Sequence, residues 1–329
     1  MMTSLQSMTG YEQLLAAPVG LVATDEPLCR HSSWQIGGPA DLLIEPANPA
    51  QVATVMQMVE KHQLPLVIIG QGTNLLFDDA GVRGVVMKIG SRMDSIDIAG
   101  NRIVAGGGAW VPQVARRAMR AGLAGLEHCI GIPGTLGGLV MMNGGSHRRG
   151  IGEQVVCVTV IERDGTLRRL SAAECRFGYR YSALQEHGVV VVEVELECPR
   201  GDVGHIRREM LLDLRTRSRK FPRKQPNCGS VFLSTSEMHA TVGPPGKVIE
   251  DAGLKGLRCG AAEVSRRHGN FIVNLGGATS ADVLKLISGI RKVIREQLDF
   301  DLCCEVRYVS SAGEICPADQ IADRLFPAV

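Results

Sequence analysis

Residues 40–77 read "ADLLIEPANPAQVATVMQMVEKHQLPLVIIGQGTNLLF", and this stretch decides the fold of the first part of the chain. Its segment 48–63 predicts a helix, because Asn-Pro at the start supplies a cap and a first-turn proline. The apolar segments 40–46 and 65–70 on either side predict short strands, so the order indicates a small α/β unit. The buried face of the helix is expected to consist of Val52, Val55, Met56 and Val59.

The middle of the chain is richer in strands. The segment 155–170 predicts a β-hairpin that turns at Asp164 and Gly165. A helix is expected over 111–122, where Gly122 ends it. Further strands are expected at 84–89, 102–108 and 188–197, which favours an antiparallel sheet.

The pattern changes near residues 198–204. A helix with a charged face is expected over 205–217, followed by the basic run "RTRSRKFPRK". Residues 281–298 predict a long amphipathic helix, with Ser280 as its cap. Residues 302–309 alternate like a strand.

The composition is that of an ordinary globular protein. The chain has 329 residues, of which 45% are hydrophobic and 21% are charged, enough for two or three domains. A net charge of +2 and 4% aromatic residues give no case for a nucleic-acid or membrane partner.

The ten cysteines are scattered singly, apart from Cys303 and Cys304, with no CxxC motif and no zinc-ligand spacing. They favour a reducing, cytoplasmic location and no metal site. The N-terminal "MMTSLQSMTGYEQ" has no signal-peptide pattern, and the apolar runs are too short to span a bilayer.

Two glycine-rich stretches invite a phosphate-binding interpretation. Residues 69–77 form a glycine-rich turn straight after a strand, and residues 131–145 hold six glycines in a loop. Neither is a Rossmann fingerprint or a Walker loop. For either loop alone, tight packing is an equal alternative, but together they favour a large, extended, phosphate-bearing ligand.

Several side chains have chemical potential but an ordinary structural alternative. Arg180 lies between two tyrosines, where it either stacks on a ring or holds a carboxylate. Glu305 is either a solvent-facing strand residue or a buried proton donor. His268 is more often a structural hydrogen-bonding group than a base, and Ser230 in "QPNCGSVFLST" (225–235) lacks any hydrolase motif.

Seven stretches carry a resemblance when they are taken together in order. They resemble the UDP-N-acetylenolpyruvoylglucosamine reductase family of flavoenzymes, also called UDP-N-acetylmuramate dehydrogenases, over about residues 29–310. The stretches are "HSSWQIGGPADLLIEP", "IGQGTNLLF", "GLAGLEHCIGIPGTLGGLVMMNGG", "FGYRYS", "CGSVF", "GLKGLRCGAAEVSRRHGNFIVN" and "CCEVRYV".

The resemblance implies an α+β fold with a two-part FAD-binding region of the vanillyl-alcohol-oxidase type and an α/β substrate-binding domain. The expected parts are an N-terminal extension (1–20), an α/β FAD-binding subdomain (21–90), a strand-rich FAD-binding subdomain (91–203), the substrate-binding domain (204–310) and a C-terminal tail (311–329).

The resemblance also implies FAD and NADPH as cofactors. Hydride passes from NADPH to flavin N5 and then to C3 of an enolpyruvyl ether, and a proton is added at C2. Arg180 and Glu305 would polarise the substrate carboxylate, and Ser230 would donate the proton to C2. The implied FAD-binding residues are Gly70, Gln71, Gly72, Thr73, Asn74, Leu75, Gly131, Ile132, Pro133, Gly134, Thr135, Gly137, Gly138 and Asn143.

The implied substrate is a nucleotide sugar used in peptidoglycan precursor synthesis, with no obligate protein partner. The expected substrate-binding residues are Tyr179, Lys220, Arg223, Lys224, His268 and Asn270. The chain departs from the pattern of the family after Ser230, where residues 233–246 replace an Asn-Pro segment with a longer one. It also lacks a tyrosine-bearing insertion between 180 and 230, as in the shorter subclass of the family.

Two alternatives remain open at this point. One is a related FAD-dependent oxidoreductase with a different substrate, suggested by the altered segment 233–246. The other is a flavin-binding protein without turnover, which the presence of Arg180, Ser230 and Glu305 argues against.

Overall fold

The computed structural model describes residues 9–327 and forms two compact units. Unit 1 is built from residues up to 24, 42–71 and 84–217, and unit 2 from 25–41, 72–83 and 218 onward. The expected N-terminal extension (1–20) and C-terminal tail (311–329) therefore lie partly outside the described residues. The division into the domains 21–90, 91–203 and 204–310 stays a prediction.

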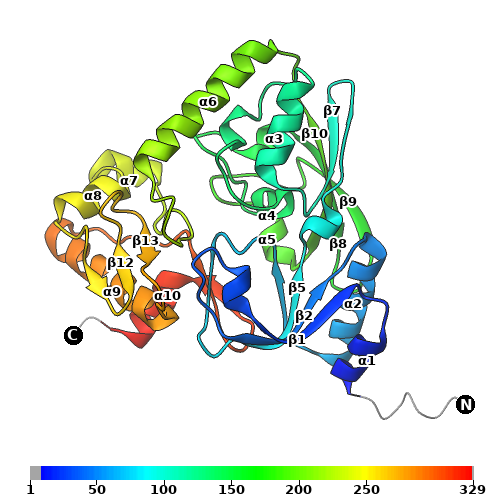
Figure 1. The fold of residues 1–329 in the computed structure, drawn as a ribbon, viewed down its shortest axis with the longest axis horizontal. Helices are drawn as coiled ribbons and strands as arrows, with labels where there is room; N and C mark the ends of the chain where they lie inside the picture. The colour runs from blue at the N-terminus through cyan, green and yellow to red at the C-terminus, as the bar shows by residue number, and fades with distance from the viewer. Residues whose placement is uncertain (1–8, 328–329) are drawn as a thin grey trace, which may run out of the picture. The chain divides into compact units, whose positions relative to one another are not determined.

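The first sheet contains the strands of the α/β unit predicted around residues 40–77, and it is drawn in blue to cyan in Figure 1. Its strand order is β1-β2-β5-β3. Strands β3 and β5 are parallel, with Val67 opposite Val86. The elements of this region are α1 (Gly10–Ala16), β1 (Leu21–Pro27), β2 (Pro39–Glu45), α2 (Pro49–His62), β3 (Leu66–Ile69) and β5 (Val82–Lys88).

The predicted helix of this region is confirmed as α2. The Asn48 side chain accepts a hydrogen bond from the Gln51 N–H at its start, and the chain leaves the helix through Gln63 in the left-handed conformation. Its buried residues are the predicted Val52, Val55, Met56 and Val59.

The second sheet of unit 1 is antiparallel, as predicted, with the order β6-β7-β10-β8-β9. The strand expected at 84–89 does not belong to it, because it pairs in parallel with β3 as β5 of the first sheet. The hairpin between β8 and β9 turns at Asp164 and Gly165, where Gly165 has a φ of 84°. The elements are β6 (Ile96–Ala99), β7 (Arg102–Gly106), α3 (Val111–Arg120), α4 (Leu136–Met141), β8 (Val155–Ile161), β9 (Leu167–Ser171), α5 (Leu184–His187), β10 (Val190–Glu197) and α6 (Val203–Lys220).

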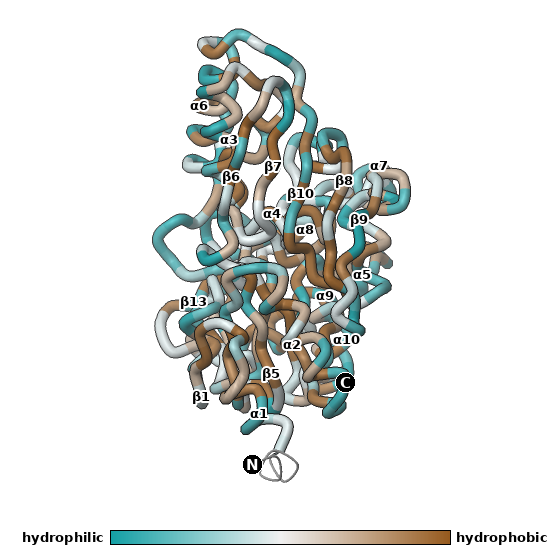
Figure 2. Tube along the Cα trace, turned by 90° about the vertical axis from the view of Figure 1, so that its right-hand side faces the viewer, coloured by the Kyte–Doolittle hydropathy of each residue, from teal (hydrophilic) through white to brown (hydrophobic). Residues whose placement is uncertain are grey.

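Apolar side chains from both sheets form the cores of unit 1. One cluster joins α3 and α4 to the antiparallel sheet, and another packs α2 on the first sheet. Figure 2 shows hydrophobic residues in brown along β5 and β8. These long apolar strands are the reason that the sheets fold with one face against helices.

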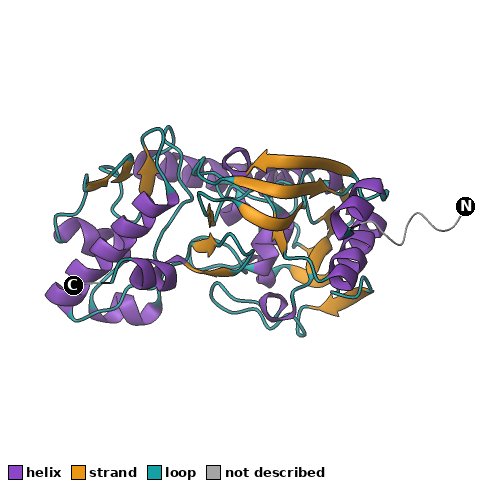
Figure 3. Ribbon diagram, turned by 90° about the horizontal axis from the view of Figure 1, so that it is seen from below, coloured by secondary structure: helices purple, strands orange, loops and turns teal. Residues whose placement is uncertain are grey.

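Unit 2 has shorter strands and more helix, as Figure 3 shows around the C-terminus. Its core packs around α9 and contains Trp34, Phe232 and Ile287. The elements are β4 (Leu75–Phe77), α7 (Ser236–Thr241), α8 (Pro245–Asp251), β11 (Arg258–Cys259), β12 (Ala262–Val264), β13 (Ile272–Asn274), α9 (Ser280–Leu298), β14 (Arg307–Val309), β15 (Ile315–Pro317) and α10 (Ala318–Leu325).

Three expectations about local structure need correction. The cap of α9 is Thr279 rather than Ser280, because the Thr279 side chain accepts from the Asp282 N–H while Ser280 donates to Asp79. The stretch 131–145 is not all loop, since α4 begins after Thr135. In the stretch 302–309 burial alternates as expected, but only Arg307–Val309 forms a strand.

The altered segment 233–246 contains a helix of its own, α7. The Thr235 side chain accepts from the Met238 N–H and so caps this helix, and Met238 is buried in the core of unit 2. Among residues 9–327, no helix is long and apolar enough to cross a membrane.

Candidate active site

The second glycine stretch lies in unit 1, where backbone packs directly on backbone. The Leu136 N–H donates to the Ala109 carbonyl at 2.8 Å, and the Gly137 N–H donates to the Gly107 carbonyl at 2.8 Å. A Cβ on Gly137 would meet that Gly107 oxygen at 3.0 Å, and a Cβ on Gly107 would meet the Val191 oxygen at 2.2 Å. Glycine is therefore needed here for close approach of the backbone.

Gly70, at the start of the first glycine stretch, contacts the second one. A Cβ on Gly70 would lie 2.3 Å from Thr135 Oγ1, the same hydroxyl that accepts the Gly138 N–H at 3.4 Å. The two predicted FAD-binding stretches thus meet at Gly70 and Thr135. A glycine-rich backbone without side chains suits a phosphate-bearing ligand at such a place.

Asn143 ties the second glycine stretch to neighbouring loops. Its side-chain Nδ2 donates to the Gly178 carbonyl at 2.8 Å, and its Oδ1 accepts from the Gly152 N–H at 2.9 Å. Its φ is 41°, in the left-handed region. The amide of Asn143 is thereby used for holding loops, and its contact with FAD stays a prediction.

The start of the same stretch is covered by a charged cluster from α6 that the sequence did not reveal. A Cβ on Gly131 would lie 2.4 Å from Cδ of Arg217 and 3.3 Å from Oδ2 of Asp213. Asp213 is buried and accepts from His147 Nε2 at 2.8 Å. Burial lowers the pKa of Arg217, and Asp213 opposes that effect. The spacing of four residues on one helix was the signal that could have identified this pair.

Arg180 sits in a tight turn between Gly178 and Tyr181, whose backbones pair with each other. Its φ is 53°, an uncommon conformation for a residue with a side chain, and it costs of order 1 kcal/mol. Its Nη2 donates to the Gly145 carbonyl at 3.3 Å, and its guanidinium lies 5.3 Å from the ring centre of Tyr179. Arg180 therefore lies beside the end of the second glycine stretch.

The loop that carries Arg180 is anchored on the end of α4. The Ser182 hydroxyl and the Gln185 Nε2 both donate to the Met141 carbonyl, at 2.7 and 2.9 Å. Tyr179 is 54% exposed, so its ring is accessible to a ligand. Together these contacts hold the Arg180 turn against the predicted FAD-binding stretch.

Ser230 and Glu305 are brought together in unit 2, although 75 residues separate them in sequence. The Glu305 N–H donates to the carbonyl of Val231, the residue after Ser230, at 2.8 Å. The Asn74 Nδ2 donates to the Glu305 carbonyl at 3.0 Å. Glu305 lies in a bend before β14 and is half-buried, rather than in the expected strand. The predicted proton donor, one polarising group and one FAD-binding residue are therefore neighbours.

The remainder of the first glycine stretch, 72–75, packs on the same segment. The Cys228 thiol lies 3.5 Å from the carbonyl oxygens of Gly72 and Leu75, and burial raises the pKa of Cys228 to about 12, which keeps the thiol neutral. Gly72 has a φ of 59°, and a Cβ there would lie 2.0 Å from the His31 carbonyl oxygen.

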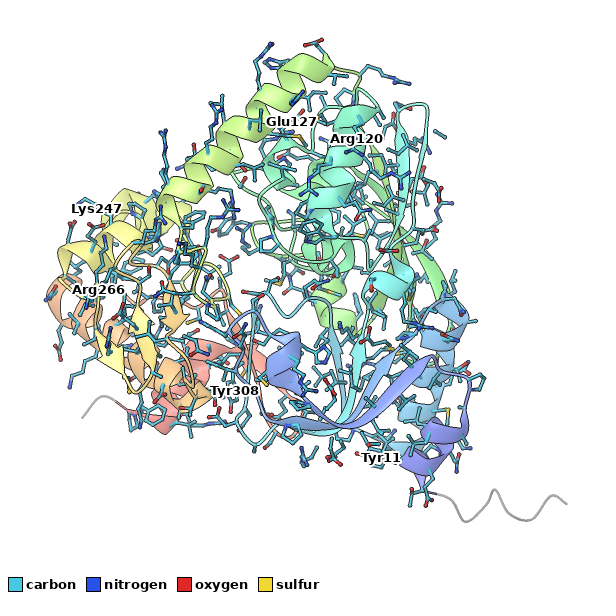
Figure 4. The ribbon with its side chains drawn as sticks, in the orientation of Figure 1. Tyr11, Arg120, Glu127, Lys247, Arg266 and Tyr308 are labelled. Carbon is cyan, nitrogen blue, oxygen red and sulfur yellow. The ribbon has the colours of Figure 1, made fainter. Side chains whose placement is uncertain are left out.

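Strand β14 continues this arrangement beyond Glu305. It pairs in parallel with β4, so that Arg307 is opposite Leu75. Tyr308, labelled in Figure 4, follows on β14, and its hydroxyl donates to the Asp78 carboxylate. Burial and this contact raise the pKa of Tyr308, so that the phenol stays protonated.

Asn270, an expected substrate-binding residue, is buried and bonded to the backbone of Phe232. Its Oδ1 accepts from the Phe232 N–H at 2.8 Å, its Nδ2 donates to the Phe232 carbonyl at 2.9 Å, and its own carbonyl accepts from Val231. These bonds position the segment that follows Ser230. A substrate contact through Asn270 stays a prediction.

His268 is half-buried and packs its ring against Phe221 and Phe271, at 5.3 and 5.0 Å between ring centres. Its Nδ1 accepts from the Asn270 N–H at 3.2 Å. Burial lowers the pKa of His268, and Lys255 and Lys220 lower it further. The neutral imidazole is therefore favoured near neutral pH.

Three basic residues expected to bind substrate are exposed on unit 2, namely Lys220, Arg223 and Lys224. Their contact with a substrate stays a prediction. Arg223 donates to the Ser218 hydroxyl at 3.0 Å. Sequence reasoning missed Arg267, which donates to the Ser218 and Arg219 carbonyls at the end of α6.

The predicted site residues thus fall into two groups, each coherent by itself. Unit 1 holds Gly70, Gln71, the stretch 131–143 and Arg180, and unit 2 holds 72–75, Ser230 and Glu305. Among the described residues, no group of three or more His, Cys, Asp or Glu side chains is arranged to hold a metal ion.

Comparison with family models gives two matches. Residues 221–309 match the model described as UDP-N-acetylenolpyruvoylglucosamine reductase, C-terminal domain, and residues 40–171 match the model described as FAD binding domain. The first covers Ser230 and Glu305, and the second covers both glycine stretches up to Asn143.

Whole-chain comparisons agree with these matches. The chain is 46% identical over 307 residues to UDP-N-acetylenolpyruvoylglucosamine reductase 1 of Corynebacterium glutamicum, covering 93% of this chain and 92% of the relative. It is 41% identical to the reductase of Bacillus velezensis, over 91% and 97% of the two chains.

One solved structure of similar sequence supports the fold. The UDP-N-acetylenolpyruvylglucosamine reductase of Thermus caldophilus superposes with a TM-score of 0.74 at 31% identity, covering 88% of this chain and 98% of that one. The predicted α+β fold, with an FAD-binding region followed by a reductase C-terminal domain, is confirmed.

Proposed function

Because the chain belongs to the UDP-N-acetylenolpyruvoylglucosamine reductase family, a family of oxidoreductases, we propose that it uses NADPH to reduce the enolpyruvyl ether of UDP-N-acetylglucosamine. The product is UDP-N-acetylmuramate, a peptidoglycan precursor. The double bond gains a hydride at C3 and a proton at C2, and NADPH is oxidised to NADP⁺.

FAD binding in unit 1 is supported by the match of residues 40–171 to the FAD binding domain and by the contact of the two glycine stretches at Gly70 and Thr135. When bound, FAD supplies the two-electron relay from NADPH to the substrate. The protein contributes binding, orientation and charge. Gly70–Leu75 and Gly131–Asn143 are the proposed FAD-binding segments.

Substrate reduction needs stabilised negative charge and a proton. Hydride addition at C3 moves charge onto C2 and the substrate carboxylate, so a nearby cation and a hydrogen-bond donor lower the barrier. We assign the cation to Arg180, the second polarising group to Glu305 and the proton for C2 to the Ser230 hydroxyl. A serine hydroxyl is a weak acid, and it acts here because the carbon that it protonates is strongly basic.

The observation that carries the proposal is the hydrogen bond from the Glu305 N–H to the Val231 carbonyl. It joins the Glu305 backbone to the residue after Ser230, and Asn74 donates to the Glu305 carbonyl. A proton donor beside a polarising carboxyl group suits addition to an enolate-like intermediate.

The test separates the two half-reactions. In Ser230→Ala, NADPH should reduce bound flavin at the normal rate, whereas reoxidation by UDP-N-acetylglucosamine enolpyruvate should slow by about 10²- to 10³-fold. Ser234→Ala, four residues away, is the control and should behave as wild type. Equal losses in both half-reactions of Ser230→Ala would show that Ser230 has a structural role.

A protein with bound FAD but no turnover of the enolpyruvyl substrate would instead favour the related oxidoreductase with another substrate. The segment 233–246, with helix α7, is the feature that would then account for the change. We further propose a nucleotide-sugar substrate and a cytoplasmic location, which the ten free cysteines support.

A further inference from the structure

Residues beyond 309 follow the part of the chain that matches the reductase C-terminal model, and they return to Glu305. Strand β15 pairs with β14, and α10 begins directly after it, at Ala318. The Ala318 N–H donates to the Val306 carbonyl at 3.0 Å. The Asp319 Oδ1 accepts from the Cys304 N–H at 2.9 Å. The first two residues of α10 thus hold both neighbours of Glu305.

The peptide of Glu305 itself is held by other segments. Its N–H donates to Val231 and its carbonyl accepts from Asn74. The backbone from 304 to 306 is therefore bonded to segments from three distant parts of the sequence. Because these hydrogen bonds hold the backbone on every side, they fix the direction in which the half-buried Glu305 side chain leaves it.

Asp319 is a buried charge with a buried counter-charge. Asp319 is 8% exposed and Arg291 on α9 is 7% exposed, with Arg291 Nη1 lying 3.7 Å from Asp319 Oδ2. Arg291 also donates to Asp323, at 2.8 Å from Nη2. Burying an ion pair is costly unless its geometry is good, and a neutral acceptor would serve the Cys304 N–H in an ordinary core. The hydrogen bond to the Cys304 N–H therefore does not by itself explain why a charged carboxylate occupies position 319.

Helix α10 is packed into the core of unit 2, so the position of Asp319 is fixed. Ala318, Ile321 and Ala322 are buried in the core of unit 2 together with Ile287 and Ile290 of α9. The amphipathic helix thereby carries the carboxylate to the backbone beside Glu305 as part of a packed layer.

From these contacts we propose that Asp319, with Arg291 as its counter-charge, is a positioning residue that sets the Glu305 carboxyl group for substrate reduction. The inference rests on the proposed function. It assigns a task to the C-terminal tail, which the resemblance leaves without one. A displacement of about 1 Å at a reacting group costs on the order of 10²-fold in rate, so this anchor has a measurable effect.

The experiment compares Asp319→Leu, Asp319→Asn and Asp323→Asn in the full-length holoenzyme. Asp319→Leu removes the acceptor for the Cys304 N–H and should slow flavin reoxidation by the enolpyruvyl substrate by about 10- to 100-fold, in kcat rather than KM. Asp319→Asn keeps an acceptor oxygen and should recover most of the rate. Asp323→Asn, which contacts Arg291 from the exposed side, should match wild type. Flavin reduction by NADPH should be unchanged in all three.

A second variant guards against misfolding. Asp319→Leu alone leaves Arg291 buried with a single remaining partner, whereas Arg291→Met with Asp319→Leu removes both charges and is expected to fold. The double variant should show the same selective loss. If it is folded, with FAD bound, and reoxidises at the wild-type rate, the inference is wrong.

A coupling measurement distinguishes positioning from general damage. If Asp319 acts through Glu305, adding Asp319→Leu to Glu305→Gln should produce little further loss. Multiplicative losses would contradict the inference. Failure of the proposed function is a separate result, because wild-type enzyme would then fail to reduce the enolpyruvyl substrate at all.

Discussion

The candidate site residues of unit 1 and those of unit 2 are held by different means. In unit 1 the glycines Gly70, Gly107 and Gly137 bring backbone against its neighbours with no room for a Cβ. In unit 2 the side chains of Asn74 and Asn270 bond to backbone groups around Glu305 and Ser230.

The difference follows from what each set of residues has to do. The proposed FAD-binding stretches of unit 1 have to lie close together, and glycine allows their backbones to pack directly on neighbouring segments. A proton donor and a polarising group need a fixed direction, and hydrogen bonds from side chains to backbone provide it. Arg180 is the exception, since it lies in unit 1 but is assigned to the chemistry with Ser230.

The largest expected effect concerns this exception. Arg180→Met should slow flavin reoxidation by the enolpyruvyl substrate by about 10²- to 10³-fold, because it removes the cation from the charge that develops. Combined with Ser230→Ala, the loss should be smaller than the product of the two single losses, since both act on one transition state. Transient kinetics of the flavin absorbance provide the measurement.

Arg176→Met is the matched control for Arg180. Arg176 also has a positive φ, of 43°, and its exposed side chain pairs with Glu186. Wild-type rates in Arg176→Met would show that the loss in Arg180→Met is chemical. Fully multiplicative losses in the Arg180 and Ser230 double variant would mean that the two residues do not share a step.

A smaller effect is expected for the glycine contact. Gly70→Ala places a Cβ 2.3 Å from the Thr135 hydroxyl, and overpacking of this kind costs about 1–3 kcal/mol. FAD affinity should fall with it, because the two glycine stretches must separate. Titration of apoprotein with FAD and thermal unfolding would measure both quantities.

Gly229→Ala tests whether adding a Cβ to a glycine of unit 2 leaves FAD affinity unchanged. A Cβ at Gly229 meets nothing within 4 Å, although its φ of 78° makes alanine cost about 1 kcal/mol. FAD affinity should stay near the wild-type value in Gly229→Ala. If FAD affinity fell equally in Gly70→Ala and Gly229→Ala, the proposed difference between the glycines of unit 1 and those of unit 2 would be wrong.

The smallest effect is on stability against pH, and each unit has one histidine that contributes. In unit 1 burial lowers the pKa of His128 from its ordinary value of 6.5, and Arg149 adds to this. In unit 2 burial lowers the pKa of His268, together with Lys255 and Lys220, whereas Glu250 opposes. Both pKa shifts therefore favour the neutral imidazole in the folded protein.

The sign follows from proton binding. As pH falls below about 6.5, the unfolded chain binds protons that the folded protein does not, so the free energy of unfolding decreases until the lowered pKa values are reached. Urea unfolding at about pH 7.5 and about pH 5.5 should show this loss. His128→Asn and His268→Asn should each flatten the dependence. A slope that is unchanged in both would exclude these histidines as its source.

Local patterns in the sequence predicted the elements whose causes are local. The cap and apolar face of α2, the hairpin turn at Asp164 and Gly165, and the antiparallel middle sheet are confirmed, because caps and periodicity act within a few residues. The resemblance identified the family and the FAD-binding region.

Other features depended on contacts between distant segments. The alternation of apolar and polar residues predicted a strand through Glu305. A strand also needs a partner strand, and the neighbouring segment at Val231 forms only isolated hydrogen bonds with it. Thr279 rather than Ser280 caps α9, because Ser280 is bonded to Asp79, about 200 residues away.

The sequence by itself determined the family, the order of the helices and strands that have a clear period, such as α2, β8 and α9, and which residue types are available for chemistry. Only the tertiary structure decided that Ser230 lies beside Glu305, that Arg180 adopts a left-handed turn, and that Asp319 reaches back to the Cys304 backbone. The physical reason is that helix caps and hydrophobic periods are short-range, whereas these hydrogen bonds form only after the core has brought remote segments together.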